Sequence, residues 1–330
     1  MQTTRITSVA PSRTITGGRV SILGSGFPVS PDRLPDVVIG GDAARVVFAS
    51  PSQVDVIVTT TESGTLPVRI TGAADEGRLQ VAAVLASGVH QVDSPVFDRS
   101  GNLYLTYSGS RGQQVPVSIF RVAANGTRES FSSSITNPTG MAVSPDGDVY
   151  VSSRFEGNIY RLLDDGTAEI YATDLGIPCG LAVAPDGTVY VGDRSGTIFE
   201  VLQGGRARTF ATLPPSVAAF HLALGSDGLY VTAPTLSAQD VIYRVSLSGD
   251  VTIYQRGFGR PQGLAVAPDG TLLVVEALAG VSGVYRVRSD EAPELVLSGP
   301  RLVGVAFDSS GDIVVCSADT AYRCPARTAA

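Results

Sequence analysis

The side chains best suited to chemistry in this chain are two histidines and one aspartate. His90 and His221 are the only histidines among the 330 residues, and Asp93 lies shortly after His90. An imidazole titrates near neutral pH, and a neighbouring carboxylate can orient the ring and stabilise its protonated form. His221 with Asp93 can therefore act as a general base and acid. The structural alternative is that Asp93 only caps a backbone turn or pairs with an arginine.

Asp93 and His221 belong to an internal repeat that recurs six times. Copies such as IPCGLAVAPDGTVYV, from Ile177, and RPQGLAVAPDGTLLV, from Arg260, alternate apolar residues around an Asp-Gly turn. The turn glycines are Gly101, Gly147, Gly187, Gly228, Gly270 and Gly311, at successive intervals of 46, 40, 41, 42 and 41 residues. A repeat of about 40 residues with about four short strands is typical of a β-propeller blade, so six blades are predicted.

The last copy of the repeat ends before its fourth strand. Earlier copies continue with strands such as EIYAT at Glu169, whereas the sixth copy stops soon after Cys324. The segment LQVAAVL, residues 79–85, precedes the first copy at the spacing of a fourth strand. Because an open ring would leave two unpaired sheet edges, we predict that residues 79–85 form the closing strand of the last blade.

The copies resemble NHL repeats, and the ring over residues 79–326 is similar to the senescence-marker-protein/gluconolactonase group. The segment ITSVAPSRTITGGRVSILGSGF, from Ile6, resembles the opening of an IPT/TIG domain, a short sandwich related to the immunoglobulin fold. The predicted architecture is all-β: a six-bladed β-propeller preceded by a small immunoglobulin-like (IPT/TIG) β-sandwich. The predicted domains are residues 1–76 and 77–330, with a small acidic linker at 71–77.

The gluconolactonase-like resemblance implies a metal site where the first strand of each blade meets the channel. In that group, the position eight residues before the turn glycine supplies Glu, Asn and Asp oxygens to one divalent cation. The six occupants here are Asp93, Thr139, Cys179, Phe220, Gln262 and Val303. Calcium takes about six to eight oxygen ligands, usually with several carboxylates. The cofactor that the resemblance implies is therefore one Ca²⁺ in the channel, with Asp93 as its carboxylate ligand in an incomplete set.

Ligand binding is expected on the face that carries the strand 2–3 loops and the links between blades, called the connection face. Six variable loops meet there at the channel mouth, whereas the opposite, turn face carries the Asp-Gly turns. Arg154 and Arg194 come from neighbouring blades and can clamp a carboxylate or phosphate, unless they only pair with acidic neighbours on a solvated rim. The other predicted ligand-binding residues are His90, Tyr107, Thr139, Phe220, Gln262 and Glu276.

Composition excludes several functions. All 24 basic residues are arginines, which rules out Schiff-base chemistry and lysine general bases. A net charge of −7 argues against a nucleic-acid partner. No apolar run reaches the roughly 20 residues that span a bilayer, and no signal peptide is visible. We expect either a cytoplasmic protein or an exported one whose leader has been removed.

Three functions are compatible with these features. The incomplete metal ring and the lack of a compact catalytic motif favour a binding protein whose channel mouth takes a small molecule, glycan or peptide. The alternative is a gluconolactonase-like hydrolase or lyase that uses Asp93 and His221 at the same mouth, with or without a metal. A third is a structural role in which both domains serve association. Whether the protein is an enzyme, and its oligomeric state, stay open from the sequence.

Overall fold

The structure, a computed structural model, describes residues 3–30, 33–267, 269–278 and 280–326. Residues 1–2 and 327–330, which the sequence assigns to the ends of the two predicted domains, lie outside the described residues. The described residues form β-strands, turns and loops but no helix, so no membrane-spanning helix is found among them. The all-β prediction is confirmed.

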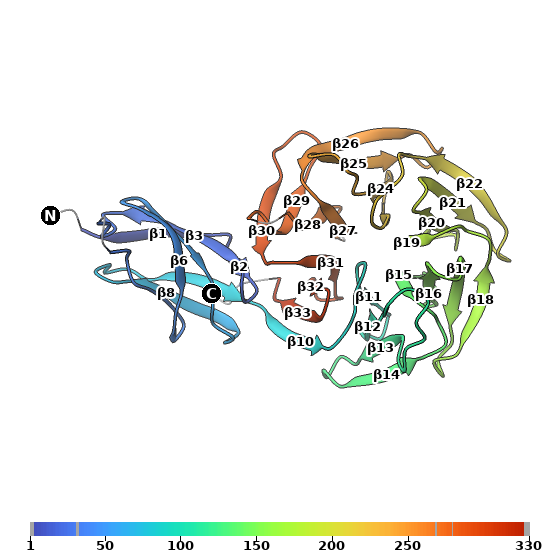
Figure 1. The fold of residues 1–330 in the computed structure, drawn as a ribbon, viewed down its shortest axis with the longest axis horizontal. Helices are drawn as coiled ribbons and strands as arrows, with labels where there is room; N and C mark the ends of the chain where they lie inside the picture. Colours follow the sequence, from blue (N-terminus) through green and yellow to red (C-terminus); the bar gives the residue numbers. More distant parts are fainter. Residues whose placement is uncertain (1–2, 31–32, 268, 279, 327–330) are drawn as a thin grey trace.

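The first domain is a sandwich of two sheets, drawn in blue to cyan in Figure 1. One sheet has the strand order β1-β3-β7-β6, and the other contains β2-β9-β8-β4-β5. Alternating residues such as Val20, Ile22, Val54 and Val56 are buried between the sheets. The strands are β1 (Arg5–Ala10), β2 (Arg13–Thr14), β3 (Arg19–Ser25), β4 (Val37–Ile39), β5 (Asp42–Ala43), β6 (Arg45–Ser50), β7 (Gln53–Ile57), β8 (Gly64–Ile70) and β9 (Gly77–Val81).

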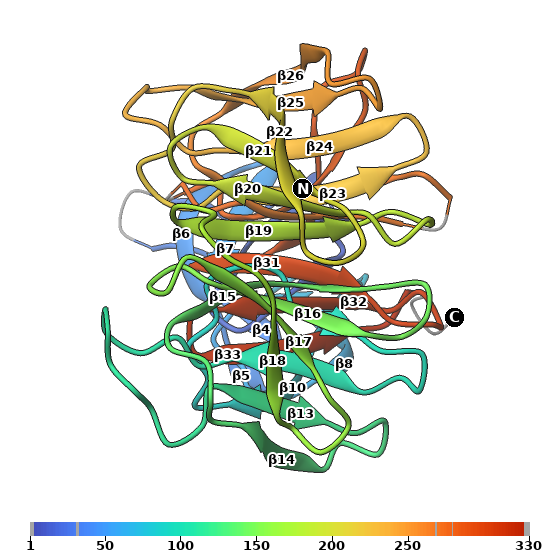
Figure 2. The same ribbon diagram turned by 90° about the vertical axis from the view of Figure 1, so that its right-hand side faces the viewer.

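The rest of the chain forms a ring of six four-stranded blades around a central channel (Figure 1). Figure 2 shows β19, β20, β21 and β22 of the third blade following one another outward from the channel. Blade one contains β11 (Val96–Phe97), β12 (Leu103–Thr106), β13 (Ile119–Val122) and β14 (Arg128–Ser132). Blade two contains β15 (Pro138–Val143), β16 (Val149–Ser153), β17 (Asn158–Leu162) and β18 (Ala168–Ala172). Blade three contains β19 (Pro178–Val183), β20 (Val189–Asp193), β21 (Thr197–Val201) and β22 (Ala207–Thr212). Blade four contains β23 (His221–Gly225), β24 (Gly228–Thr232), β25 (Asp240–Val245) and β26 (Val251–Phe258). Blade five contains β27 (Pro261–Val266), β28 (Leu272–Glu276), β29 (Gly283–Val287) and β30 (Glu294–Ser298). Blade six contains β31 (Leu302–Phe307), β32 (Ile313–Ser317), β33 (Thr320–Cys324) and β10 (Ala83–Ser87).

The hydrophobic core of the propeller lies between its blades. Each apolar cluster of the ring joins two successive blades, as when Ile159 of the second blade and Val191 of the third pack in one cluster. The second strands are buried on both faces, and every residue of β16, β20 and β28 is buried. Their first three or four residues, VYV in β16 and β20 and LLVV in β28, are therefore all apolar or aromatic, because neither face meets solvent.

The last blade is closed by β10, which precedes the first blade in the sequence. β10 pairs antiparallel with β33, with Ala83 opposite Arg323 and Ser87 opposite Thr320. The predicted closing strand, residues 79–85, is corrected by this register, because residues 79–81 belong to β9 of the first domain. Leu79 is fully buried in the core of that domain, and this burial fixes the register of β9. The predicted linker at 71–77 is instead mostly the turn between β8 and β9.

The two domains share one continuous sheet. β2 of the first domain lies between β9 and β30 and runs parallel to both, so a sheet of nine strands extends across the domain boundary. Thr14 in β2 is fully buried, and its Oγ1 accepts a hydrogen bond from Oγ of Ser298 at 2.9 Å. Gly18 makes this approach possible, because a Cβ there would lie 2.1 Å from Oγ1 of Thr14. The seam gives the first domain a fixed place beside the fifth blade (Figure 1).

Candidate functional site

The first strands of the blades approach one another closely around the channel. A Cβ on Gly180, for example, would lie 2.5 Å from the carbonyl oxygen of Phe220 in the next blade. The fourth blade has His221 at the position that this glycine occupies, and the first blade has Ser94. The other blades also have glycine there, namely Gly140, Gly263 and Gly304. His221 therefore places a large polar side chain in a ring built for very small ones.

His221 and Asp93 meet across the channel. Asp93 precedes the first blade and His221 begins β23 of the fourth, so they approach from opposite sides of the six-bladed ring. Nδ1 of His221 lies 2.7 Å from Oδ1 of Asp93, and the two side chains are 0% and 8% exposed. Because an ionised carboxylate can only accept, Nδ1–H donates, and in the neutral imidazole Nε2 carries the free lone pair. The pair expected from the sequence is thus in direct contact.

Asp93 is held in place by hydrogen bonds on both sides of its backbone. The backbone N–H of Ser94 donates to Oδ1 of Asp93 at 2.6 Å, and the Gln91 amide donates to the Asp93 carbonyl at 2.7 Å. Gln91 is buried, and its Oε1 in turn accepts from the backbone N–H of Thr106 at 2.9 Å. Sequence reasoning missed Gln91, which holds the segment that carries Asp93. Its buried place is decided by the path of residues 88–91, which precede the first copy of the repeat.

Several buried polar side-chain atoms of the propeller have no partner among the described residues. They are Nε2 of His221, Nε2 of Gln262 and Oγ of Ser108. Thr232, opposite His221 in the β23–β24 ladder, donates from Oγ1 to the carbonyl of Gln262 at 2.6 Å, so His221 and Gln262 lie on adjoining segments. Ser108 lies on the connection face of the first blade. Buried polar atoms nearly always have partners, so the two on His221 and Gln262 point to a missing polar partner where their segments adjoin.

The other end of the channel is apolar. A cavity of about 560 Å³ extends from Ser94 and Leu222 to the turn face, lined mostly by apolar residues from the first strands of all six blades. Ser94 and Leu222 directly follow Asp93 and His221, so their contact closes the inner end of this cavity. We call the end with Asp93, His221 and Gln262 the polar end. The channel is therefore divided by the Asp93–His221 contact into an apolar end and a polar end.

Arg154 stands on the connection face without a counter-ion. Its side chain is partly buried, and among the described residues it makes no hydrogen bond or ion pair. Burial lowers the pKa of Arg154, and the charges of Arg194 and Arg111 lower it further. Three guanidinium groups are thus close enough to repel one another. The predicted alternative, pairing on a solvated rim, does not hold for Arg154, because Oε2 of Glu156 accepts from the Tyr160 hydroxyl at 2.9 Å instead.

A loop of the first blade carries Arg111 to this place. Asn137, with φ of 49°, is fully buried and accepts at Oδ1 from the backbone N–H of Gly112 at 2.6 Å. Its amide nitrogen donates to the carbonyl of Ser110 at 2.7 Å. A Cβ on Gly112 would lie 2.9 Å from the ring of Phe155, so the loop packs on the residue that follows Arg154. The sequence marks this loop as an insertion, but Arg111 and Asn137 were not predicted to belong to the site.

Three predicted residues of the ring do not face a ligand. Phe220 is fully buried in the core between blades three and four, against Gly192, and is therefore not a wall of the channel mouth. Thr139 is fully buried, and its Oγ1 donates to the carbonyl of Asn137 at 3.3 Å. Cys179 is 2% exposed, and burial raises the pKa of its thiol to about 11. A thiol in that state is no nucleophile near neutral pH, so Cys179 fills space in the core.

Two other predicted ligand residues make contacts within the protein. Glu276 is 2% exposed, and its carboxylate accepts backbone N–H groups of Gly259, Arg260 and Leu278 at 2.7–2.8 Å. It caps the connection that leads into the fifth blade, and so the ligand role expected for Glu276 does not fit its position. Arg194 donates to the carbonyl of Val217 at 2.8 Å, which fixes its guanidinium without neutralising its charge.

His90 and Tyr107 lie together at the edge of the same face. The two rings meet edge to face, with centroids 6.0 Å apart. Burial lowers the pKa of His90, and the charge of Arg154 lowers it further. His90 is therefore a neutral imidazole near the arginines, while Tyr107 covers the ring of Phe120 behind it.

The residues of the ring do not fit the cation that the gluconolactonase-like resemblance implies. Among the described residues, no three His, Cys, Asp or Glu side chains form a metal-binding group. One oxygen of Asp93 already contacts His221 and Ser94, and three of the corresponding positions hold a buried thiol, a phenyl ring and an isopropyl group. Calcium needs several oxygen donors, and this ring offers one carboxylate, one amide and one hydroxyl.

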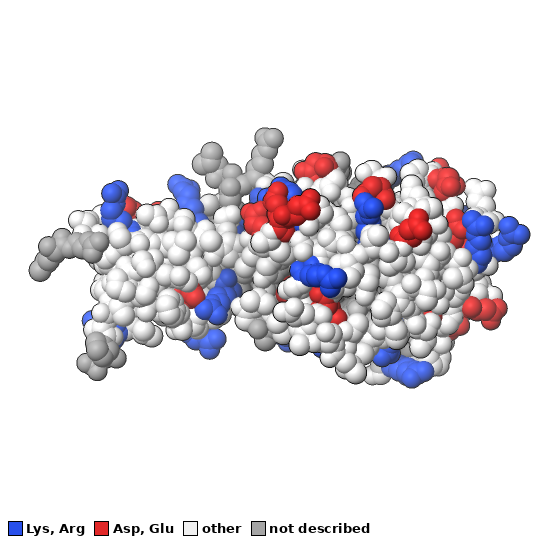
Figure 3. All heavy atoms as spheres, turned by 90° about the horizontal axis from the view of Figure 1, so that it is seen from above, with Lys and Arg blue, Asp and Glu red and all other residues white. Residues whose placement is uncertain are grey.

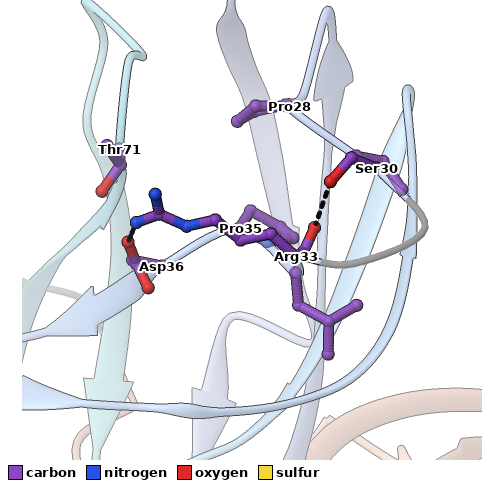
Figure 4. A pocket seen from close by; sticks show the side chains of 8 residues that line it. Pro28, Ser30, Arg33, Pro35, Asp36 and Thr71 are labelled. Atoms are coloured by element: carbon purple, nitrogen blue, oxygen red, sulfur yellow. Dashed lines mark hydrogen bonds and ion pairs between the residues drawn. The ribbon is translucent and has the colours of Figure 1, made fainter.

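Two further surface features are weaker as candidate sites. In the view of Figure 3, acidic and basic side chains are interspersed over a mostly uncharged surface. A cavity of about 270 Å³ in the first domain is bordered by Pro28, Pro35 and Thr71 (Figure 4). Its Arg33 is already paired with Asp36 at 2.8 Å, and both side chains are largely exposed. Exposed pairs of this kind contribute little binding energy.

Fold and site together define a two-domain all-β protein with a polar site in the channel of a six-bladed propeller. The first domain is an IPT/TIG domain, since residues 4–81 match the family model of that domain. This match also agrees with a first domain that ends with β9. No curated protein sequence matches the chain.

Solved structures share the propeller fold at low identity. An auxiliary nutrient binding protein from Bacteroides thetaiotaomicron is 12% identical, with a TM-score of 0.56 over 98% of this chain and 97% of that chain. A gluconolactonase from Xanthomonas campestris is 16% identical, with a TM-score of 0.59 over 90% and 99% of the two chains. Virginiamycin B lyase from Staphylococcus aureus is 15% identical, with a TM-score of 0.51 over 89% and 99%. These likenesses establish the fold and confirm the gluconolactonase-like resemblance of the propeller.

Proposed function

We propose that this protein binds a polar small molecule at the polar end of the propeller channel. The observation that carries the proposal is the pair of buried polar atoms without partners at that end, Nε2 of His221 and Nε2 of Gln262. A buried polar atom without a hydrogen bond costs about 1–3 kcal/mol. A ligand that supplies the missing donors and acceptors would recover that cost on binding, which is the physical basis of its affinity.

The architecture is compatible with such a role. A nutrient binding protein is among the structures that share the fold over nearly the whole chain, which supports binding as a function of this architecture. The channel holds an apolar cavity of about 560 Å³ on the turn-face side of the Asp93–His221 contact, and the proposed polar site lies on the other side of that contact. A glycan or a peptide end is accommodated by the same chemistry, provided that it presents hydroxyl or amide groups.

A ligand screen with a local reporter tests this proposal. Because the chain has two histidines, the imidazole resonances of His221 and His90 are easily separated by NMR. We expect small polar molecules that bind the protein to shift the His221 resonance. We also expect Gln262→Ala to weaken their binding. Gln203→Ala is the matched control, since Gln203 is exposed beside Gly187 on the turn face. Ligands that leave His221 unchanged, or that bind both variants equally well, would refute a site at the polar end.

A hydrolase or lyase is the second candidate, favoured by the Asp93–His221 contact. The carboxylate orients the imidazole and leaves Nε2 as a base, which is the arrangement required for general acid–base catalysis. It ranks second because the sequence shows no compact catalytic motif around this pair. A substrate, like the proposed ligand, reaches the fully buried Nε2 of His221 only after neighbouring side chains move. The test is turnover of lactones and of substrates for elimination.

In that test, His221→Gln should reduce turnover at least about a hundredfold, as expected for loss of a general base. Asp93→Asn should reduce it as well, because an amide can hold the wrong tautomer of the ring. If turnover is found and survives in His221→Gln, the Asp93–His221 contact is not the catalytic group.

A further inference from the structure

We propose that the ligand of this site carries an oxyanion, a carboxylate or a phosphate, which is bound by Arg154 together with Arg111 and Arg194. This inference rests on the proposed function and specifies the chemistry of its ligand. The three arginines form what we call the arginine rim. They come from three successive blades, one to three, and lie on the connection face, where Gly112 beside Arg111 packs against Phe155 beside Arg154.

The arginine rim is assembled by contacts that the protein holds in place. Arg154 and Arg194 follow β16 and β20 at corresponding positions of adjacent blades. Arg111 is brought beside them because Asn137 binds the backbone of Gly112 at 2.6 Å and that of Ser110 at 2.7 Å. Asn137 adopts a positive φ, which is unusual for a residue other than glycine, to make these bonds. The geometry of the loop is therefore specified rather than incidental.

The positive charge of the arginine rim is not balanced within the described residues. Arg154 and Arg111 make no ion pair there, and Arg194 donates only to main-chain carbonyls of Ser216 and Val217. The nearby carboxylates are engaged elsewhere, since Asp193 accepts from the backbone N–H of Ile177 at 2.7 Å. Eleven other arginines among the described residues pair with a carboxylate, as Arg161 does with Glu169. The contrast points to an external anion as the partner of the rim.

The geometry favours an oxyanion over a halide or a neutral group. A guanidinium group presents planar, parallel donors that match the two oxygens of a carboxylate or phosphate. Partial burial of Arg154 removes competing water, which strengthens such a contact. In the free protein the same burial is unfavourable, because a half-buried charge with two like charges nearby is destabilising. Arg154 is therefore expected to cost stability in the absence of its ligand.

The experiment measures anion binding to the full-length protein. The probes are inorganic phosphate and succinate, added at constant ionic strength against sodium chloride, and the reporter is the Nε–H resonance of Arg154. We expect saturable shifts, with Arg154→Gln weakening binding at least about tenfold, the usual size of one charge-assisted contact. The matched control is Arg206→Gln, because Arg206 is exposed and lies at the strand 3–4 turn on the opposite face. The probe that binds more tightly shows whether the oxyanion of the ligand is a phosphate or a carboxylate.

Stability supplies a second, independent readout. Arg154→Gln should leave the melting temperature of the free protein unchanged or raise it. A lower melting temperature would mean that the guanidinium has a partner within the protein, and the proposal would fail. Equal weakening by Arg154→Gln and Arg206→Gln would show only nonspecific attraction and would also overturn it.

The outcomes separate this inference from the proposed function. Neutral ligands that depend on Gln262 but are indifferent to Arg154 would disprove the oxyanion while leaving a polar site in the channel. Failure of every ligand to shift His221 or Arg154 would disprove both. Anions that need Arg154 and also shift His221 would support both.

Discussion

The contact between Asp93 and His221 makes a prediction about stability that only the folded ring can explain. The two residues are 128 positions apart and lie on opposite blades. Asp93→Ala would leave Nδ1–H of a fully buried imidazole without an acceptor. Loss of such a partner costs about 1–3 kcal/mol, and about 3–5 kcal/mol where the partner left behind is charged. Because the pair is almost fully buried, we expect a coupling free energy of about 2–3 kcal/mol between the two side chains.

The assay is a double-mutant cycle on the free energy of unfolding in urea, followed by circular dichroism at pH 7. The variants are Asp93→Ala, His221→Ala and the double substitution. The matched control is a cycle on Arg161 and Glu169, which lie 3.0 Å apart but are 39% and 56% exposed. Exposed pairs couple by less than about 1 kcal/mol. A coupling between Asp93 and His221 no larger than that of the control would refute the buried contact across the channel.

Three further predictions concern the closure of the ring, the charge at its mouth and the metal. Ala86→Asp in β10 should lower the free energy of unfolding by at least about 3 kcal/mol, because it puts a charge into the core between the last and first blades. Its control is Val84→Asp in the same strand, which should have little effect because Val84 is 62% exposed. Equal effects in urea unfolding would mean that β10 does not close the last blade. The imidazole of His90 should titrate below 6.5 in NMR, and Arg154→Gln should raise its pKa. Since the folded protein binds this proton more weakly than the unfolded chain does, the free energy of unfolding should fall as the pH drops below about 6.5. This fall should be smaller in Arg154→Gln. A free energy of unfolding that rises on acidification would contradict the placement of His90 beside Arg154. Metal analysis of protein purified without chelator should find no stoichiometric calcium, and a stoichiometric ion lost in Asp93→Ala would show that the donor set has been misjudged.

The sequence by itself determined the architecture of this protein. Its recurring Asp-Gly and Ser-Gly turns predict six blades because each turn closes a hairpin of similar length, and a repeat of that size has few other packed solutions. It also indicated His221 as an exception, since the other copies near it have glycine at the same position. These are local patterns, and local patterns are visible without tertiary structure.

Tertiary structure decided which of the candidate residues share a site. The repeat places Asp93 and His221 on opposite blades, and only closure of the ring brings their side chains to 2.7 Å. From their positions in the repeat, Phe220 and Glu276 are expected to face the channel mouth. In the fold the first packs between blades and the second caps a connection, because the pleat and the loop geometry set the direction of each side chain.

The boundary between the domains was also decided in three dimensions. Sequence spacing indicated that a strand near residue 79 closes the last blade, but Leu79 is buried in the first domain, so the closing strand begins at Ala83. The two-residue strand β2, which joins the domains, is too short to carry a recognisable pattern. A sequence records which residues can form strands and turns. Which strands pair across hundreds of residues depends on the competition among all buried surfaces, and only the complete fold resolves it.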